Sequence, residues 1–312
     1  MKALVTGANG FIGQHLVRRL SYAGWEVAGV QRQGQITHLN QVFGSLDIPP
    51  DKLSDVDVIY HTAGLAHSNA KSSSKKVMEQ VNAHDSVSLF NNASAAGVGK
   101  FVCLSSIKVL GDVSSTPFKP SDPHAPTDRY ARSKALAEVL LQQASAAQES
   151  THSSTHLAIV RPPLVYGAGV SANFLKLGHW ALSGWPLPLL QATAPRAWIG
   201  VRNLVNFMLH LGAPHLADVS GIWHVRDEEE ASVVQMIGKI CDLAEQPKRL
   251  FSVHPTMFKT MVTLMARPSL SQRFFAPLQI DISESQTELD WHPTYRQREE
   301  LEEFLDWLQT QS

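Results

Sequence analysis

The 312-residue sequence predicts an α/β fold, in which a doubly wound parallel sheet carries a smaller, interwoven C-terminal unit. Two observations support this prediction. Short apolar runs alternate with stretches of helical periodicity, as they do where helices join parallel strands. The first apolar run, residues 3–5, leads into Gly7, Gly10 and Gly13, and a helical pattern follows at once. Strand, glycine turn and helix in this order are typical of the first half of a dinucleotide-binding unit.

Each of the three glycines has a place in such a turn. Gly7 would permit the tight turn, Gly10 would let a pyrophosphate approach the backbone, and Gly13 would let the helix pack closely on the strand. The exposed N–H groups at the start of the helix would hold the phosphates. The spacing G-x-x-G-x-x-G differs from the usual G-x-G-x-x-G, so the position of the glycines between strand and helix carries more weight than the triplet itself.

The end of the second predicted strand, residues 26–30, bears on the choice of cofactor. An acidic residue there would bind a free ribose 2′-hydroxyl, whereas an arginine accommodates a 2′-phosphate. The chain has Gln31 and Arg32 at this point and no acid. We therefore favour NADP over NAD. In the alternative, Arg32 stacks on adenine or faces solvent, and both cofactors are accepted.

The later elements extend the alternation and then depart from it. Residues 56–61 form a predicted strand whose small successors, Ala63 and Gly64, would let a ligand approach the sheet. Further strands are predicted at 100–104, 157–160 and 221–225, and helices at 78–96, 130–148, 201–211, 231–244 and 295–308. Beyond Gly167 we expect loops and short elements. We assign 1–167 to a dinucleotide-binding domain, to which 199–225 returns, and 168–198 with 226–312 to a substrate-binding domain.

Composition and charge narrow the class of protein. An apolar content of 44% and a charged content of 18% are those of a soluble globular protein. The net charge of −1 gives no electrostatic case for binding nucleic acid or an anionic membrane. Two cysteines, no signal-peptide pattern and no spanning segment lead us to expect a cytoplasmic protein, without a predicted metal site. Residues 257–278 are apolar and basic; we interpret them as a mobile lid helix rather than a surface contact.

A tyrosine and a lysine provide the candidate catalytic pair. Tyr130 and Lys134 are four residues apart on one face of a predicted helix. A tyrosine with its ordinary pKa of about 10 is a poor acid or base at neutral pH. A lysine cation beside it would favour the phenolate and lower that pKa. An isolated Tyr-x-x-x-Lys is usually a solvated helix face, but this one follows the glycine turn and a strand that ends in Ser105 and Ser106.

With these motifs the chain resembles the extended short-chain dehydrogenase/reductase superfamily, that is, the NAD-dependent epimerase/dehydratase family. The resemblance rests on residues 6–13, 61–64, 105–106, 130–134 and 161–167. It implies a Rossmann-type sheet, a proton-transferring Tyr130, a Lys134 that tunes the tyrosine and binds the nicotinamide ribose, and a Ser106 that binds the reacting oxygen, with Ser105 as the second choice. The cofactor-binding residues it implies are Gly7, Asn9, Gly10, Phe11, Ile12, Gly13, Arg32, Ala63, Gly64, Tyr130, Lys134 and Pro162.

The same resemblance suggests residues for the substrate, although the chain departs from the family in two places. Arg196 is the candidate for gripping a sugar-nucleotide diphosphate, since a guanidinium suits bidentate phosphate binding; Asn203 stands nearby where the family has aspartate. Asn173 resembles the asparagine at the substrate entrance, and Arg273 is a second diphosphate candidate. Lys108 replaces a small or polar residue and would contact a phosphate or an acyl oxygen, or else lie at the surface.

The stretches 105–109, 161–167 with 172–175, and 186–189 further resemble a subgroup of bacterial surface-polysaccharide enzymes that includes 4-epimerase-like proteins and UDP-N-acetyl-quinovosamine dehydrogenase. The resemblance implies a 4-keto reductase of a UDP-2-acetamido-2,6-dideoxy-hexose. The alternative is a 4-epimerase of a UDP-hexose such as UDP-glucose or UDP-GlcNAc. An alternative of another class is a non-catalytic NAD(P)-sensing module. Dehydration is disfavoured, because Ile107 and Lys108 replace an acidic pair. A homodimer, common among relatives, is one candidate assembly.

Overall fold

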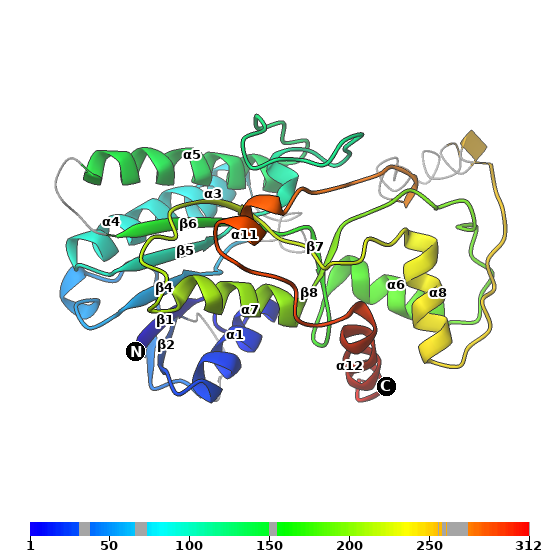
Figure 1. Ribbon diagram of the computed structural model, residues 1–312, viewed down its shortest axis with the longest axis horizontal. Coiled ribbons are helices and arrows are strands. Elements are labelled where there is room, and N and C mark those ends of the chain that lie inside the picture. Colours follow the sequence, from blue (N-terminus) through cyan, green and yellow to red (C-terminus); the bar gives the residue numbers. More distant parts are fainter. Residues whose placement is uncertain are drawn as a thin grey trace.

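The structure is a computed structural model that describes residues 1–30, 38–65, 74–149, 155–254, 256–257, 260 and 274–311. Its central feature is a sheet of seven parallel strands in the order β3-β2-β1-β4-β5-β6-β9 (Figure 1). These strands are β1 (Lys2–Thr6), β2 (Glu26–Val30), β3 (Gln41–Phe43), β4 (Val58–His61), β5 (Lys100–Leu104), β6 (His156–Arg161) and β9 (Gly221–His224). The strand order reverses between β1 and β4, where ligands bind in sheets of this type. The predicted α/β fold is confirmed.

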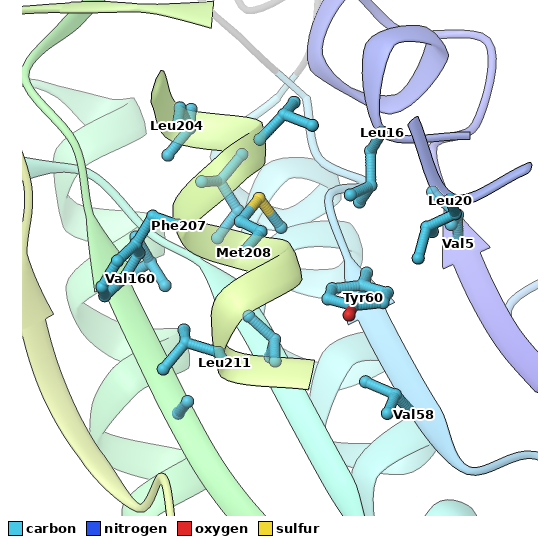
Figure 2. Packing of buried hydrophobic residues seen from close by; sticks show 14 of the residues in the cluster. Val5, Leu16, Leu20, Val58, Tyr60, Val160, Leu204, Phe207, Met208 and Leu211 are labelled. Carbon is cyan, nitrogen blue, oxygen red and sulfur yellow. The ribbon is translucent and has the colours of Figure 1, made fainter. Parts of the chain in front are cut away.

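Helices cover both faces of the sheet. On one face lie α1 (Phe11–Tyr22) and α7 (Val201–Gly212), and on the other α4 (Asp85–Ala95) and α5 (Arg129–Glu149) (Figure 1). Figure 2 shows Phe207 and Met208 of α7 among side chains of the strands, with Tyr60 nearby. Successive strand residues point to opposite faces, so Leu4 packs with the α4 side and Val5 with the α1 side. Leu4 and Val5 are both buried, because helices cover both faces of the sheet. This explains why the strands are continuous apolar runs.

The predicted helix at 78–96 differs in detail from the observed one. It consists of α3 (Lys75–Glu79), the π-helical turn η2 (Gln80–His84) and α4. Single π-helical turns inside helices are frequent at functional sites, and this one contains the buried Asn82. The 3₁₀ turns η1 (Pro50–Lys52) and η3 (Ile107–Val109) follow β3 and β5 along the chain.

A second core forms away from the sheet. It contains α6 (Ala172–Leu182), α8 (Val233–Leu243), α12 (Gln297–Gln309) and the two-stranded sheet β7 (Leu164–Tyr166) and β8 (Trp198–Gly200), while α11 (Ser283–Thr287) bonds to β9 through Ser285. The prediction of only loops and short elements at 168–198 was wrong, because α6 is a regular helix. Its buried residues Phe174, Leu177, Gly178 and Ala181 repeat at helical spacing. Of the predicted lid at 257–278, most residues lie outside the described part of the chain.

The glycine turn after β1 leaves no space for a side chain on the first turn of α1. A Cβ atom on Gly13 would lie 2.1 Å from the carbonyl oxygen of Gly7, which is a backbone atom. By contrast, a Cβ on the exposed Gly44 would have nothing within 4 Å. Gly13 therefore permits the close approach of helix and strand that its place in the sequence predicts.

We expect Gly13→Ala to lower the free energy of unfolding by about 1–3 kcal/mol, the usual cost of overpacking. Gly44→Ala is the matched control and should leave stability unchanged or slightly raised. Urea unfolding of both variants measures the difference. Equal midpoints for the two variants would show that the contact is not restrictive.

Glu300 is a buried acid between the two cores. It lies on α12 against Gly200, where β8 ends, and a Cβ on Gly200 would come within 2.4 Å of its carboxyl carbon. The Arg202 backbone N–H donates to its Oε1 at 3.1 Å. Burial raises the pKa of Glu300 to about 8, and the neighbouring Asp227 adds to the effect. Between its unfolded pKa and about pH 8, the folded state therefore holds a proton that the unfolded state releases.

This difference makes stability fall as the pH rises from about 5 to 8, because the unfolded state binds fewer protons. Glu300→Gln keeps an oxygen for the Arg202 N–H and removes the titration. We expect it to stabilise the protein at pH 8.5, on the order of 2 kcal/mol, and to have much less effect at pH 5. Thermal melts at the two pH values test this, and a pH-independent effect would contradict it.

Candidate active site

The glycine turn forms a bare backbone cradle at the start of α1. Gly7 has a φ of 65°, a conformation that favours glycine, and its carbonyl accepts the N–H of Gly10 at 2.8 Å. A Cβ on Gly7 would lie 2.9 Å from the backbone of Ala63, which follows β4. The ends of β1 and β4 therefore meet at the cradle. Small residues at both strand ends leave the backbone accessible to a ligand that binds the helix terminus.

Lys134 reaches the same place from α5. A Cβ on Gly64 would lie 3.6 Å from the Lys134 Nζ, and this ammonium donates to the carbonyl oxygen of Leu104, at the end of β5, at 2.7 Å. Burial lowers the pKa of Lys134. The structure thus brings together the ends of three strands and one helix, with residues up to 127 positions apart in the sequence.

Asn82 holds the start of α5 in place. Its amide accepts the backbone N–H of Leu65 at 2.7 Å and donates to the Ser133 hydroxyl at 2.9 Å. Ser133 in turn donates to the carbonyl oxygen of Tyr130 at 2.8 Å. The π-helical turn η2 therefore connects the segment after β4 to the turn of α5 that carries Tyr130.

The pKa of Tyr130 differs from the sequence-based expectation. We predicted that the Lys134 cation would lower it, but burial raises the pKa of Tyr130 to about 12, with a further contribution from the carboxylate of Asp128. The physical reason is that burial disfavours the phenolate, while the Lys134 ammonium is engaged with the Leu104 carbonyl. With this pKa, Tyr130 is a protonated phenol at neutral pH and a weaker acid than an ordinary tyrosine.

The two serines after β5 have different partners. The Ser105 hydroxyl is buried and donates to the carboxylate of Glu138. The Ser106 hydroxyl begins the turn η3 and accepts the backbone N–H of Lys108 at 3.3 Å. The backbone N–H of Ile107, the residue after Ser106, donates to the carbonyl oxygen of Pro162 at 2.9 Å. This contact places Pro162 beside the turn η3. Ser106 remains the candidate for substrate binding, because Ser105 belongs to a structural network.

That network is a buried ion pair which the sequence did not predict. Glu138 is four residues after Lys134 and eight after Tyr130, so it shares their face of α5. Arg161 of β6 donates to both Glu138 oxygens, with a closest approach of 2.6 Å, and to the carbonyl oxygen of Pro120 at 2.9 Å. His124 lies 2.8 Å from the same carboxylate. These contacts hold the Glu138 pKa below its ordinary value despite burial.

Lys108 links the two candidate catalytic elements. Its ammonium forms ion pairs with Asp128 and, at 3.4 Å, with Asp112. Asp128 also accepts the Ala131 N–H at 2.8 Å and so caps the start of α5. Lys108 therefore joins η3, which carries Ser106, to the helix that carries Tyr130. Its predicted contact with a phosphate or an acyl oxygen stays a prediction.

The remaining predicted residues lie partly in the glycine turn and partly in the second core. Phe11 packs near Gly169, Ile12 lies at the edge of the core, and Asn9 accepts a hydrogen bond from Gln14 through its carbonyl. Arg196 is half-buried and donates to the Ala276 carbonyl, while its own carbonyl accepts the Ala231 N–H at 3.3 Å. Asn173 is exposed on α6. Arg32 and Arg273 lie outside the described residues.

Asn203, at the family's aspartate position, has a structural role. Its side chain donates to Asp227 and to the Tyr295 carbonyl, both at 2.8 Å, and accepts the Thr294 and Tyr295 N–H groups. A cleft of about 720 Å³ lies between α8 and residues 190 and 250. Its lining includes Ala231, the hydrogen-bond partner of Arg196, but none of the predicted site residues.

We expect Glu138→Ala to destabilise the protein by about 3–5 kcal/mol, because it would leave the Arg161 charge buried without its partner. The double variant Glu138→Leu/Arg161→Met should recover most of this loss, since apolar residues of similar volume replace the pair. Chemical denaturation of the wild type and the two variants tests the pair. A double variant no more stable than Glu138→Ala would contradict the coupling.

Comparison with known proteins agrees with this architecture. A model described as the NAD dependent epimerase/dehydratase family matches residues 3–223. A UDP-glucose 4-epimerase of Vibrio cholerae is 30% identical over 302 residues, covering 93% of this chain and 90% of the relative. The solved structure of MoeE5 in complex with UDP-glucose and NAD is 23% identical to this chain and has a TM-score of 0.79. The match covers 100% of this chain and 99% of the MoeE5 chain.

A UDP-glucuronic acid 4-epimerase from Bacillus cereus, solved in complex with NAD, has the same TM-score of 0.79 at 20% sequence identity. The match covers 100% of this chain and 99% of the epimerase chain. At such identities the structural likeness shows the shared fold. In the parts of the chain that the structure describes, no helix is long and apolar enough to cross a membrane. The family match spans well over half of the sequence and includes the glycine turn and Tyr130-x-x-x-Lys134. The protein therefore belongs to the NAD dependent epimerase/dehydratase family and is an enzyme of the extended short-chain dehydrogenase/reductase type.

Proposed function

We propose that the protein transfers hydride at C4 of a UDP-hexose with a nicotinamide dinucleotide as its cofactor. The observation that carries this proposal is the position of Lys134, which follows Tyr130 by four residues on α5. Lys134 lies beside the glycine cradle, and its ammonium donates to the carbonyl oxygen of Leu104, two residues before Ser106. The cradle fits a dinucleotide, because Gly7 and Gly13 face backbone atoms so closely that a side chain at either would clash, and α1 begins at this point. The cofactor would supply the hydride acceptor or donor for the sugar carbon.

The side chains divide the remaining work. Tyr130 would hold or give the proton of the C4 oxygen. Ser106 would align the same oxygen through its hydroxyl. Lys134 would bind the nicotinamide ribose and, as a cation, favour the tyrosine's phenolate during turnover. Arg196, Asn173 and Arg273 stay candidates for the nucleotide and the sugar entrance.

Two reactions share this chemistry. The relative from Vibrio cholerae favours 4-epimerisation, in which hydride returns to the opposite face of the oxidised sugar. The stretches 105–109, 161–167 and 172–175 favour reduction of a UDP-2-acetamido-2,6-dideoxy-4-keto-hexose, the function we infer from the sequence. The preference for NADP over NAD rests on Arg32 and remains a proposal, since the solved neighbours carry NAD.

We expect Tyr130→Phe to reduce turnover by about 10²–10⁴-fold, the usual contribution of a positioned acid or base, with NAD(P) binding retained. Tyr22→Phe, at an exposed tyrosine of α1, is the matched control and should be fully active. Turnover and fluorescence titration with NADH and NADPH provide the two readouts. Full activity of Tyr130→Phe would contradict the proposed role.

The choice of reaction needs two assays with the wild-type protein. Interconversion of UDP-glucose with UDP-galactose, or of UDP-GlcNAc with UDP-GalNAc, without added cofactor would establish the epimerase. Oxidation of NADPH or NADH in the presence of UDP-4-keto-6-deoxy-GlcNAc would establish the reductase. Activity in neither assay would contradict the proposal of C4 chemistry.

A further inference from the structure

The acidic residues of this chain are distributed very unevenly. Residues 150–217 contain no aspartate or glutamate but four lysines and arginines, and residues 246–280 contain no acid and five such cations. The chain as a whole carries 28 acids and 27 lysines and arginines. The net charge of −1, which by itself gives no case for an anionic partner, therefore averages over a strongly asymmetric distribution.

The two acid-free segments meet at residues 184–190 and 249–251. The Leu187 N–H donates to the Arg249 carbonyl at 2.8 Å, and the Phe251 N–H donates back to the Leu187 carbonyl at 3.0 Å. The Arg249 guanidinium donates to the Gly184 carbonyl at 3.0 Å. In Figure 1 the loops after α6 and after α8 form the end of the molecule that is farthest from the sheet.

This end also exposes large apolar side chains. Trp185 is 75% exposed and Met257 66%, and Trp180, Leu190 and Phe251 are exposed as well. They include every exposed tryptophan and phenylalanine that the described residues contain. Lys176 is exposed four residues before Trp180 on α6, and Arg249 is exposed two residues before Phe251. We call these seven residues the Trp185 surface: Lys176, Trp180, Trp185, Leu190, Arg249, Phe251 and Met257.

Three acids near this surface each have a cation of their own, whereas a fourth, Glu245, is exposed directly before the second acid-free segment. Asp242 pairs with Lys248 at 2.7 Å, Glu229 with Lys239 at 2.6 Å, and Glu230 lies 3.9 Å from Arg226. Three of these residues, Glu229, Glu230 and Asp242, line the cleft beside α8. The sequence adds Lys259, Arg267 and Arg273 to the second acid-free segment, outside the described residues.

We propose that the Trp185 surface docks the protein reversibly on an anionic lipid bilayer. Tryptophan and phenylalanine partition into the interface between headgroups and acyl chains, and cations near them are attracted to anionic headgroups. Exposed tryptophans with neighbouring cations match both requirements. The proposal concerns a peripheral contact and is independent of the function of Ser106, Tyr130 and Lys134.

A second copy of the chain fits this surface less well than a bilayer does. A two-fold symmetric interface would bring the same patch of each copy together. Lys176 and Arg249 of both copies would then face each other across a desolvated contact without acids to neutralise them. The same charges are attracted to an anionic bilayer, while the aromatic rings bury apolar area in it.

Sedimentation with vesicles tests the proposal on the full-length protein. We expect binding to vesicles of equal parts phosphatidylglycerol and phosphatidylcholine, and little binding to phosphatidylcholine alone. The double variant Trp185→Ser/Phe251→Ser should bind at least about tenfold more weakly, since two interfacial side chains are lost. Lys176→Glu should lower the affinity about fivefold or more and reduce its salt dependence, since each cation near the surface contributes about 1 kcal/mol.

Tyr22→Ser is the matched control, because Tyr22 is 72% exposed on α1, outside the Trp185 surface. It should bind vesicles as the wild type does. Melting temperatures within the wild-type range, together with unchanged enzymatic turnover in solution, show that the variants are folded. Equal binding to both vesicle types, or undiminished binding of the double variant, would overturn the proposal. A wild-type dimer that dissociates in the double variant would also overturn it, by identifying the surface as a self-interface.

Discussion

The buried pair of Glu138 and Arg161 is the interaction on which the candidate site depends. A carboxylate and a guanidinium lose much hydration when they are buried, so they are retained only where further hydrogen bonds compensate. Here Ser105, His124 and the Pro120 carbonyl provide these bonds. Because Glu138 is on the same face of α5 as Lys134 and Tyr130, the pair fixes the rotation of the helix about its axis. It also anchors the loop that leads into α5.

Further hydrogen bonds and ion pairs hold α5 in place beside the Glu138–Arg161 pair. Asn82 and Ser133 bind the first turn of α5 from the side of β4, and Lys108 binds it from the side of β5 through Asp128. These contacts position α5 through neighbours of the catalytic candidates. This division is physically reasonable, since a side chain that must exchange a proton has to remain available to the substrate, while its neighbours determine its position.

Acidic and basic residues are distributed differently around the sheet and in the second core. Acids and bases are mixed around the sheet, where they form ion pairs and cap helices. In the second core, residues 176–196 and 246–254 carry no acids, although α8 and α12 do. Such an arrangement suits an anionic sugar nucleotide and, in our proposal, an anionic lipid surface, because both would be repelled by unpaired carboxylates.

The sequence by itself determined six of the seven strands of the main sheet, the glycine turn and the spacing of Tyr130 and Lys134, because these depend on local spacing and periodicity. It did not predict β3, β7 or β8. Strand residues are apolar on both faces, and glycine is required where the backbone of α1 meets β1; both constraints are visible in a few consecutive residues. The helix α6 was missed although its periodicity was present, because the tryptophans and prolines around it suggested loops.

Only the tertiary structure decided the roles that depend on partners distant in the chain. Ser105 and Ser106 are adjacent and chemically identical, and only the position of Glu138 separates a structural hydroxyl from a candidate catalytic one. Lys108 appears as a solitary cation until Asp112 and Asp128 are placed beside it. The same holds for the pKa of Tyr130, since desolvation depends on the whole surrounding fold, whereas the spacing of Tyr130 and Lys134 reveals only their proximity.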